Sequence, residues 1–194
     1  MKTLQNFINE CLLAESEDLR SAVDEFIRDN YTWTKGFTIS NKPNKDGKYE
    51  VHCAGNLSVQ NRNITELTND LFIWKEIRGS FFCARCESLT SLKGSPEKVG
   101  GTFDCMECNK LKTLEGAPKE VGFSFNCSSC ESLISLEGAP EKVEYFDCSY
   151  CSSLTKLKGA PKEVKGEFRC NDCKKQFTEN DINKVSLVGG EIIK

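Results

Sequence analysis

The sequence has one histidine, little net charge and no long apolar run. The histidine, His52, alternates with apolar residues in a predicted strand, so it lies on the polar face and has no catalytic or metal-binding partner in the sequence. The formal net charge is -3, which gives no electrostatic reason to expect nucleic acid or an anionic membrane as a partner. No apolar stretch has the length that a membrane-spanning helix requires.

The N-terminal stretch MKTLQNFINECLLAESEDLR also lacks the apolar core and the small-residue cleavage site of a signal peptide. Twelve cysteines would otherwise suggest the disulfide framework of a small secreted domain. Because this chain is long enough to fold without such cross-links and shows no export signal, we expect reduced thiols and a cytoplasmic location.

Ten of the cysteines lie in five CxxC pairs that recur at a fixed spacing. The pairs are Cys83/Cys86, Cys105/Cys108, Cys127/Cys130, Cys148/Cys151 and Cys170/Cys173. A phenylalanine precedes each pair, and these phenylalanines, spaced by 22, 22, 21 and 22 residues, are Phe81, Phe103, Phe125, Phe146 and Phe168. A further unit, with Leu57 and Val59 in place of Phe and Cys, comes before them. A period of this length predicts a solenoid of stacked units, each a short strand and a return segment.

Within one unit, the pattern separates buried from exposed positions. Phe103 and Cys105 are two residues apart, so on a strand they share one face, which the repeated phenylalanine marks as buried. Cys108 falls where the strand ends. The other predicted interior positions are Leu111, Leu114 and Val121.

The charged pair after each proline reverses its order from one unit to the next. The pairs are Glu97-Lys98, Lys119-Glu120, Glu141-Lys142 and Lys162-Glu163. Stacking at about 4.8 Å would therefore place opposite charges side by side, and each such exposed pair would contribute only ~0–1 kcal/mol.

The unit resembles the leucine-rich repeat, L-x-x-L-x-L-x-x-N/C-x-L. Phe103 and Cys105 match two strand leucines, Cys108 matches the Asn/Cys position, and the match covers roughly residues 57 to 175. The LxSLEGAPKEV segments are similar to those of leucine-rich repeat proteins of bacteria and their tailed phages. The resemblance implies an α/β solenoid, a right-handed superhelix of strand and coil, with a ladder of inward-pointing cysteines that hydrogen-bond turn backbone. It also implies the cytoplasm of a bacterial cell or of a host cell.

Two other roles of the CxxC pairs have to be weighed. The CxxC-x18-CxxC spacing suits zinc, so a zinc-binding protein is the alternative function. However, five pairs do not divide into four-cysteine sites, and Val59 stands at a position where a ligand could not be replaced. Redox chemistry needs an exposed thiol of lowered pKa, whereas these thiols are predicted to point inward. We therefore expect a structural ladder, with no metal and no cofactor.

The flanking segments are predicted to cover the open ends of the solenoid. Apolar stripes of helical period at residues 4–12 and 19–27 predict an N-terminal helical cap over residues 1–35. Turn residues between FTI and YEVHC predict a β-hairpin over residues 36–56. About six repeat units of 21 to 24 residues then occupy residues 57–176. Residues 177–194 are predicted to form a C-terminal cap, with Thr178 as the N-cap of a short helix and Asp181 three residues later.

The end segments are too short to hold a separate catalytic domain, such as a ligase, and no Cys/His pairing points to an enzyme. We expect a monomeric, non-enzymatic protein-interaction module that binds a protein, and neither nucleic acid nor membrane, on the concave strand face that leucine-rich repeats use. The candidate binding residues project outward from the strands and the turns after them: Phe82, Asp104, Met106, Asn126, Tyr145, Asp147, Tyr150 and Arg169.

Overall fold

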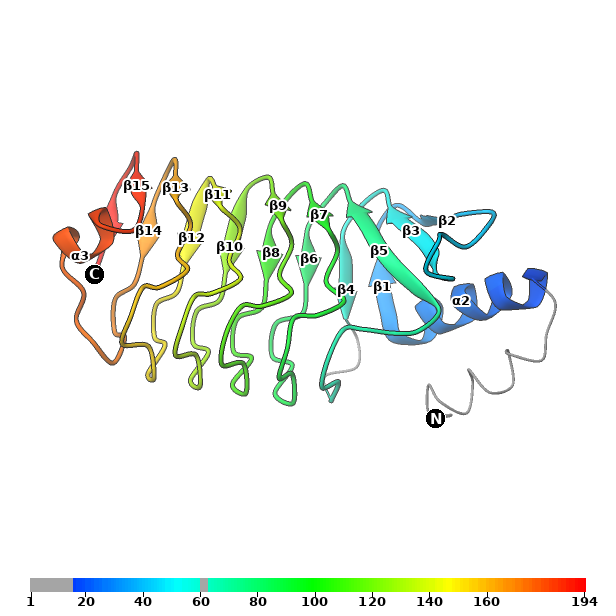
Figure 1. The fold of residues 1–194 in the computed structure, drawn as a ribbon, viewed down its shortest axis with the longest axis horizontal. Coiled ribbons are helices and arrows are strands. Elements are labelled where there is room, and N and C mark those ends of the chain that lie inside the picture. The colour runs from blue at the N-terminus through cyan, green and yellow to red at the C-terminus, as the bar shows by residue number, and fades with distance from the viewer. Residues whose placement is uncertain (1–15, 60–62) are drawn as a thin grey trace.

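The chain forms an elongated β-solenoid, in which successive coils stack along one axis (Figure 1). This computed structural model describes residues 16–59 and 63–194. The helical stripe predicted at residues 4–12 lies outside the described residues. The predicted solenoid is confirmed, with stacked coils that begin at the predicted positions: Leu57, Phe81, Phe103, Phe125, Phe146 and Phe168.

The first strand of each coil belongs to an eight-stranded sheet with the order β1-β4-β6-β8-β10-β12-β14-β16. Pairing is parallel from β4 to β16, and β1 joins β4 antiparallel. The strands are β1 (Tyr31–Trp33), β4 (Leu57–Val59), β6 (Phe81–Phe82), β8 (Phe103–Asp104), β10 (Ser124–Asn126), β12 (Tyr145–Asp147), β14 (Phe168–Arg169) and β16 (Ile192–Ile193). Because the parallel register pairs equivalent positions, each position of the repeat forms a column along the solenoid.

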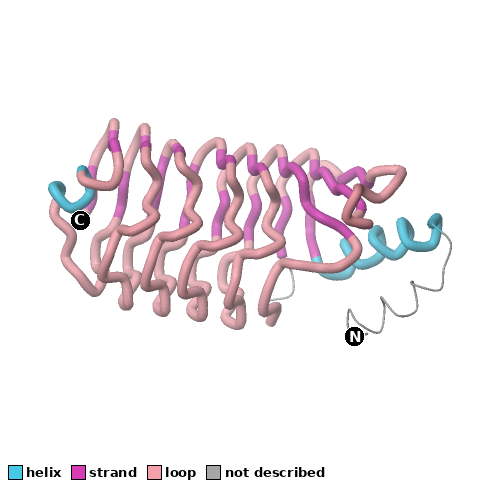
Figure 2. Tube along the Cα trace, viewed as in Figure 1, coloured by secondary structure: helices cyan, strands magenta, loops and turns pink. Residues whose placement is uncertain are grey.

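The return segment of each coil contains a second short strand (Figure 2), and a helix accompanies this strand in the coil that begins at Phe168. These strands form a five-stranded sheet, β2-β3-β5-β7-β9, and a three-stranded sheet, β11-β13-β15. Their bounds are β2 (Phe37–Ile39), β3 (Tyr49–Cys53), β5 (Phe72–Ile77), β7 (Lys98–Val99), β9 (Glu120–Val121), β11 (Lys142–Val143), β13 (Glu163–Val164) and β15 (Leu187–Val188). The α/β part of the predicted class therefore does not hold for the coils. Helix is confined, among the described residues, to α2 (Ser16–Asn30) and α3 (Glu179–Asn183).

The second row of strands is interrupted between β9 and β11, and the chain is one residue short directly after β11. Phe146 follows the preceding phenylalanine by 21 residues instead of 22. The N–H groups of Glu144 and Tyr145 both donate to the carbonyl of Phe123, at 2.9 and 3.1 Å. One carbonyl thus accepts two bonds at this corner, and no strand pairing joins β9 to β11 in the described part of the chain.

A stack of phenylalanine rings fills the interior of the coils. The ring centroids of Phe81, Phe103, Phe125, Phe146 and Phe168 follow one another at 5.5, 5.1, 5.8 and 5.3 Å. The columns that contain Leu111, Leu114 and Val121 are also buried, as predicted. Each aromatic pair adds about 0.5–1.5 kcal/mol beyond the burial of its area. The interior therefore holds neighbouring coils together through contacts that repeat from coil to coil.

The N-terminal end combines a helix and strands. α2 buries Val23 and Ile27, and its Phe26 ring lies 6.0 Å from that of Phe72. The helix ends at Asn30, and Tyr31–Trp33 is a strand, so the prediction that helix extends over residues 1–35 is wrong in its last part. The chain leaves the helix here because β1 pairs with β4, a long-range contact that a local apolar stripe does not reveal.

The hairpin predicted over residues 36–56 is present, since β2 and β3 pair antiparallel. It is not a separate unit, because β3 also pairs parallel with β5 and so begins the second row of strands. At the other end, α3 begins as predicted. Thr178 Oγ1 accepts a bond from the Asp181 N–H at 3.2 Å, and the Asp181 carboxylate accepts one from the Thr178 N–H at 3.0 Å, which together form a capping box.

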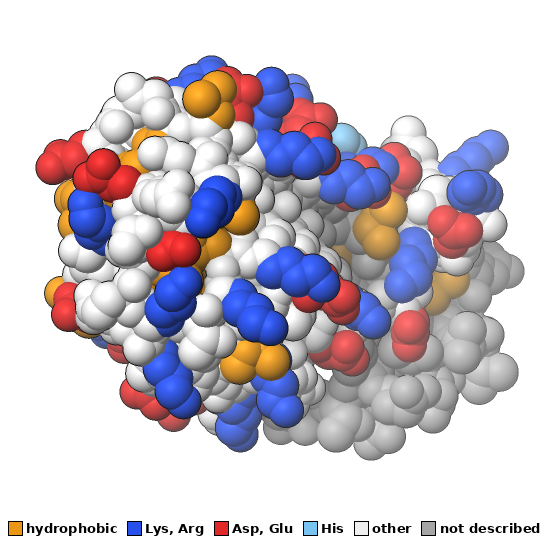
Figure 3. Space-filling model, turned by 60° about the vertical axis from the view of Figure 1, so that its left-hand side comes forward, with side chains coloured by type: hydrophobic (Ala, Val, Ile, Leu, Met, Phe, Trp, Pro, Cys, Tyr) orange, Lys and Arg blue, Asp and Glu red, His pale blue; other side chains and the backbone are white. Residues whose placement is uncertain are grey.

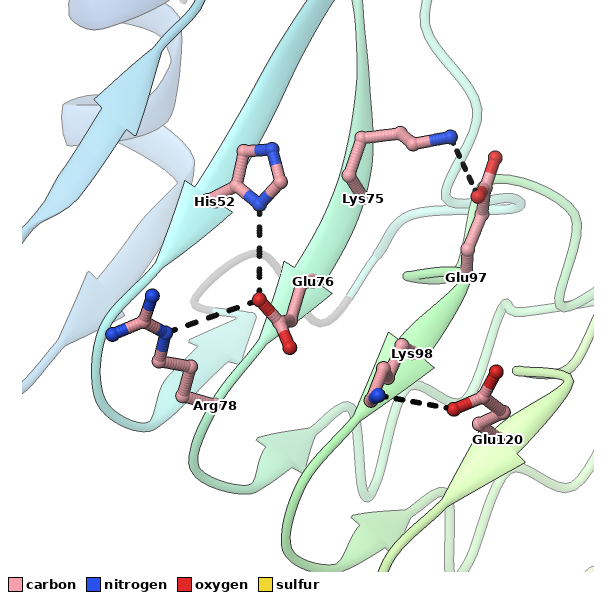
Figure 4. A network of polar contacts seen from close by, with 7 residues as sticks. All are labelled: His52, Lys75, Glu76, Arg78, Glu97, Lys98 and Glu120. Atoms are coloured by element: carbon pink, nitrogen blue, oxygen red, sulfur yellow. Dashed lines mark hydrogen bonds and ion pairs between the residues drawn. The ribbon is translucent and has the colours of Figure 1, made fainter.

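Charged side chains of successive coils pair along the second row of strands, as their reversed order predicts. Two of the predicted pairs, Lys98–Glu120 and Lys142–Glu163, have nitrogen–oxygen distances of 3.1 and 2.7 Å, and Lys75 on β5 adds a pair with Glu97 at 2.6 Å. Figure 4 shows the pairs that Lys75 and Lys98 make. Positive and negative side chains are accordingly interspersed over the surface in Figure 3. These exposed pairs favour the register but contribute little stability.

Candidate functional site

The second cysteine of a CxxC pair reaches back to the coil before it. Four such thiols donate to the backbone carbonyl of a first cysteine at 3.2 to 3.3 Å: Cys108 to Cys83, Cys130 to Cys105, Cys151 to Cys127 and Cys173 to Cys148. All four are buried. The predicted burial is confirmed, and the carbonyl partner is supplied by the preceding coil.

Cys86, the second cysteine of the first pair, differs from these four in the coil that precedes it. Its side chain is fully buried, so the predicted burial is confirmed. The preceding coil begins at Leu57 and has Val59 in place of a first cysteine, and its residues 60–62 lie outside the described part of the chain. Cys86 therefore has no first cysteine in the preceding coil to which its thiol could donate. The place of Cys86 in the cysteine ladder stays a prediction.

The first cysteine of a pair reaches forward instead. Three first thiols donate at 3.4 Å to a carbonyl of the following coil: Cys105 to Asn126, Cys127 to Asp147 and Cys148 to Arg169. The two remaining first cysteines, Cys83 and Cys170, are buried as predicted. The two thiols of one pair thus engage opposite neighbours in the central coils, and the pairs form two hydrogen-bonded ladders along the interior. The CxxC pattern does not show that the two thiols of a pair donate to opposite neighbouring coils, because their directions depend on the turn between the two cysteines.

Most thiols of these ladders are poorly suited to metal or redox chemistry, the exception being Cys173, whose hydrogen bond with Cys148 lowers its pKa. Burial raises the pKa of Cys127 and Cys148 well above the ordinary value and raises that of Cys170 to about 12. A thiol must lose its proton to bind zinc or to act as a nucleophile. In addition, no three histidine, cysteine or acidic side chains are grouped as metal ligands within residues 16–59 and 63–194. The thiols present hydrogen-bond donors to backbone rather than four converging thiolates.

His52 lies on the surface of β3. Its Nδ1 atom is 4.0 Å from a carboxylate oxygen of Glu76, which is also 3.8 Å from Nε of Arg78 (Figure 4). The histidine belongs to an exposed charge network, as expected for a residue on the polar face of a strand.

The predicted binding residues between Phe and Cys do form one column on the eight-stranded sheet. The register places Phe82 beside Asp104, Asp104 beside Asn126, Asn126 beside Asp147, and Asp147 beside Arg169. Arg169 is exposed and the other four are half-buried. The sequence thus predicts the column correctly, although most of its members are less exposed than expected.

Part of this column also supports the backbone. In each of three coils the side-chain oxygen accepts a bond from the N–H two residues later, at 3.0, 3.0 and 2.9 Å: Asp104 from Met106, Asn126 from Ser128 and Asp147 from Ser149. Aspartate and asparagine favour such turns for this reason. A substitution that removes the side-chain oxygen should therefore affect folding, which outward orientation alone did not predict.

Two exposed aromatic rings lie beside this column. Phe123 is 50% exposed and Tyr145 is 39% exposed, and their centroids are 5.1 Å apart with an edge-to-face angle of 63°. The neighbouring coils have glycine near this corner. A Cβ atom on Gly166 would lie 2.7 Å from a ring carbon of Tyr145, so the absence of a side chain makes room for the ring.

The rings border a shallow hollow of about 350 Å³ on the sheet. Its lining residues are Thr102, Phe123, Ser124, Asn126, Tyr145, Phe146, Asp147, Glu167 and Arg169. Of the predicted binding residues, the hollow brings together Asn126, Tyr145, Asp147 and Arg169. The remaining four do not line it: Phe82, Asp104, Met106 and Tyr150. Phe123 was not among the predicted residues.

Tyr150 is exposed for a backbone reason. It directly precedes the second cysteine of its pair, and the equivalent residue has φ between 55° and 61° in all five coils: Arg85, Glu107, Ser129, Tyr150 and Asp172. Non-glycine residues adopt this left-handed conformation at some cost, and here a backbone bond stabilises it, since the Tyr150 N–H donates to the Asn171 carbonyl at 2.9 Å.

The charges around the hollow are mostly acidic. Arg169 forms an ion pair with Glu167, which neutralises both. Neither Asp104 nor Asp147 forms an ion pair in the described part of the chain. Burial raises the pKa of Asp104, and the nearby negative charge of Asp147 adds to the effect. The hollow thus combines exposed aromatic surface with the carboxylate of Asp147, which forms no ion pair in the described part of the chain, although Arg169 lies beside it on the next strand.

A larger groove of about 730 Å³ runs along the other side of the coils. It passes between the Ala-Pro turns at Ala117-Pro118 and Ala139-Pro140, and charged residues such as Lys98 and Glu120, which pair with each other, border it. Its lining includes no aromatic residue. We regard the smaller hollow as the better binding candidate, because anchoring residues at interfaces are commonly aromatic.

Comparison of the chain with protein-family models, with curated proteins and with solved structures found no match. Neither described helix combines the length and the apolar character needed to cross a membrane.

Proposed function

We propose that this chain is a non-enzymatic protein-interaction module, and that a partner protein docks on the outward face of the eight-stranded sheet, over the hollow beside Phe123 and Tyr145. The observation that carries the proposal is the exposure of these two rings beside polar, half-buried side chains. Tyrosine is enriched among the residues that dominate binding energy, and such residues are typically surrounded by polar ones.

The coils are, in this proposal, a cysteine-type variant of the leucine-rich repeat. The bond from Cys108 to the backbone of the preceding coil supports it, because the resemblance implies such a bond at the Asn/Cys position. The second strand of each coil is a departure, since the return segment of that repeat is commonly a helix or a 3₁₀ turn. α2 and α3 then serve as the caps that a solenoid needs. Buried thiols suit the reducing cytoplasm of a bacterial cell or a host cell.

The alternative function is zinc binding through the CxxC pairs. It is disfavoured because the two thiols of a pair donate to opposite neighbouring coils instead of converging on one ion. Elemental analysis of the reduced protein is its direct test. We expect well under one zinc per chain. Stoichiometric zinc, together with unfolding on chelation, would establish the alternative.

The test of the docking surface is selection from a random-peptide display library, with three forms of the protein as bait. We expect the unmodified protein to enrich peptides that the double variant Phe123→Ala/Tyr145→Ala does not retain. The control is Glu141→Lys, on the turn side of the coils, which should retain them. Peptides that bind the double variant as well as the unmodified protein, or that only Glu141→Lys releases, would place the binding site elsewhere.

A further inference from the structure

We propose that the hollow beside Phe123 and Tyr145 receives an arginine side chain from an extended segment of the partner. This inference rests on the proposed function and adds the chemistry of the partner. It is carried by three features: two aspartates of the strand column that form no ion pair, the edge-to-face ring pair, and a second site in the same molecule where the same elements hold an arginine.

Acidic side chains lie in and beside the hollow: Asp147 lines it, and Asp104 lies in the same strand column outside it. Asp104 and Asp147 lie two strands apart, about 10 Å at the usual strand spacing, with the neutral Asn126 between them. The neighbouring acids are already compensated, since Glu107 pairs with Arg85 at 3.2 Å and Glu167 pairs with Arg169. Within residues 16–59 and 63–194 no cationic side chain pairs with either aspartate. A cation from outside would meet two carboxylates on one face of the sheet.

The ring pair supplies a surface for the same cation. A guanidinium within about 6 Å of an aromatic centroid is attracted to the ring face, and its planar fork matches a carboxylate better than a lysine ammonium does. Tyr145 and Asp147 are two residues apart on β12, and both line the hollow. A single arginine entering there can therefore lie against a ring and pair with the carboxylate.

The molecule contains a complete version of this arrangement near its N-terminus. Trp33 and Phe37 form an edge-to-face pair at 4.9 Å and 86°. The guanidinium of Arg28 lies 5.6 and 5.8 Å from the two ring centroids, and its Nε donates to Asp24 at 2.6 Å. The pair of Phe123 and Tyr145 has Asp147 beside it but no arginine against its rings, because Arg169, which also lines the hollow, pairs with Glu167.

The acidic charge can be removed without removing the turn that it supports. Asn126 occupies the equivalent position in the coil between Asp104 and Asp147 and makes the same bond to the N–H two residues later, at 3.0 Å. The double variant Asp104→Asn/Asp147→Asn should therefore keep the fold and lose two negative charges. An unchanged melting temperature verifies this before binding is measured.

The test uses the peptides from the display selection that require Tyr145. The strongest binder is synthesised in two forms, one with its arginines and one in which citrulline, the neutral isostere of arginine, replaces each of them. We expect arginine in most of these peptides, and binding at least about tenfold weaker with citrulline, a factor that corresponds to ~1.4 kcal/mol. In the Asp104→Asn/Asp147→Asn variant the difference should shrink to less than about threefold, and added salt should reduce it in the unmodified protein.

Four results would overturn the inference. Peptides that require Tyr145 but carry no arginine would refute it while leaving the docking surface intact. Equal affinity for the arginine and citrulline peptides, or an arginine preference that survives in the double Asn variant, would do the same. Self-association that Tyr145→Ala abolishes would show that the occupant is a second copy of this chain. If no peptide requires Tyr145, the proposed function itself fails.

Discussion

Raising the pH above about 8.5 should destabilise this protein, because several of its buried thiols keep protons that the unfolded chain releases. The pKa values of Cys105, Cys127 and Cys148 lie well above the ordinary value, the first chiefly through its hydrogen bond with Cys130 and the other two through burial. A raised pKa in the folded state stabilises the fold fully below the unfolded pKa. That stability is lost as the pH rises from the unfolded toward the folded value.

The magnitude follows from proton linkage. An unfolded cysteine with a pKa of about 8.5 is about nine-tenths ionised at pH 9.5, while the buried thiol is still protonated. Each such thiol then lowers the free energy of unfolding by about 1.4 kcal/mol between pH 7.5 and 9.5, and the three together by about 4 kcal/mol. This is a large share of the ~5–15 kcal/mol that stabilises a typical domain. Tyrosine and lysine ionise mainly above this range.

Urea denaturation at several pH values, in the presence of a reductant, measures the effect. The matched control is Cys127→Val, because Val59 fills the equivalent position in the first coil, where it is buried beside the same sheet. The variant should lose about 1.4 kcal/mol less than the unmodified protein over the same pH range. A free energy of unfolding that does not change between pH 7.5 and 9.5 would show that the thiols ionise within the fold, and the ladder description would have to be abandoned.

Three further predictions concern single contacts. Phe125→Leu should cost about 0.5–1.5 kcal/mol more than Phe81→Leu in urea denaturation, because Phe125 stacks between two rings and Phe81 on one; equal costs would count against the stack. Cys130→Ala should cost about 1–3 kcal/mol by the same assay, because it leaves a buried carbonyl without its donor; a melting temperature equal to that of the unmodified protein would contradict this. Asp147→Asn should stay within about 0.5 kcal/mol of the unmodified protein while Asp147→Ala loses about 1 kcal/mol with the turn bond, and hydrogen exchange at Ser149 should show the difference.

The repeat made the interior predictable from sequence. A fixed period and the spacing of two between Phe103 and Cys105 determine which side chains face inward, and the structure confirms their burial. The N-cap at Thr178 was also predictable, because its partner lies only three residues away. In these cases the interacting residues either repeat along the chain or are close in sequence.

The site was only partly predictable, because it depends on a departure from the repeat. Counting back from the strand phenylalanine places Tyr145 opposite Ser124 and leaves Phe123 in the loop before the strand. The shortened coil removes one residue between the two rings, and both then project from the same corner. The turn bond of Asp147 was not predicted, because the strand pattern shows only that this side chain points outward. A half-buried carboxylate can accept a backbone hydrogen bond and still face solvent.

The shortened coil shows where this architecture accepts insertions and deletions. The rings of Phe125 and Phe146 still stack at 5.8 Å across it, and Cys151 still reaches Cys127 at 3.3 Å. The lost residue alters the corner, where a single carbonyl takes up the extra bond, and the second row of strands is interrupted beside it. A change of length at this corner therefore moves the projecting side chains and leaves the interior in register. New binding specificities can arise there, through mutation or by grafting short loops, without a redesign of the coils.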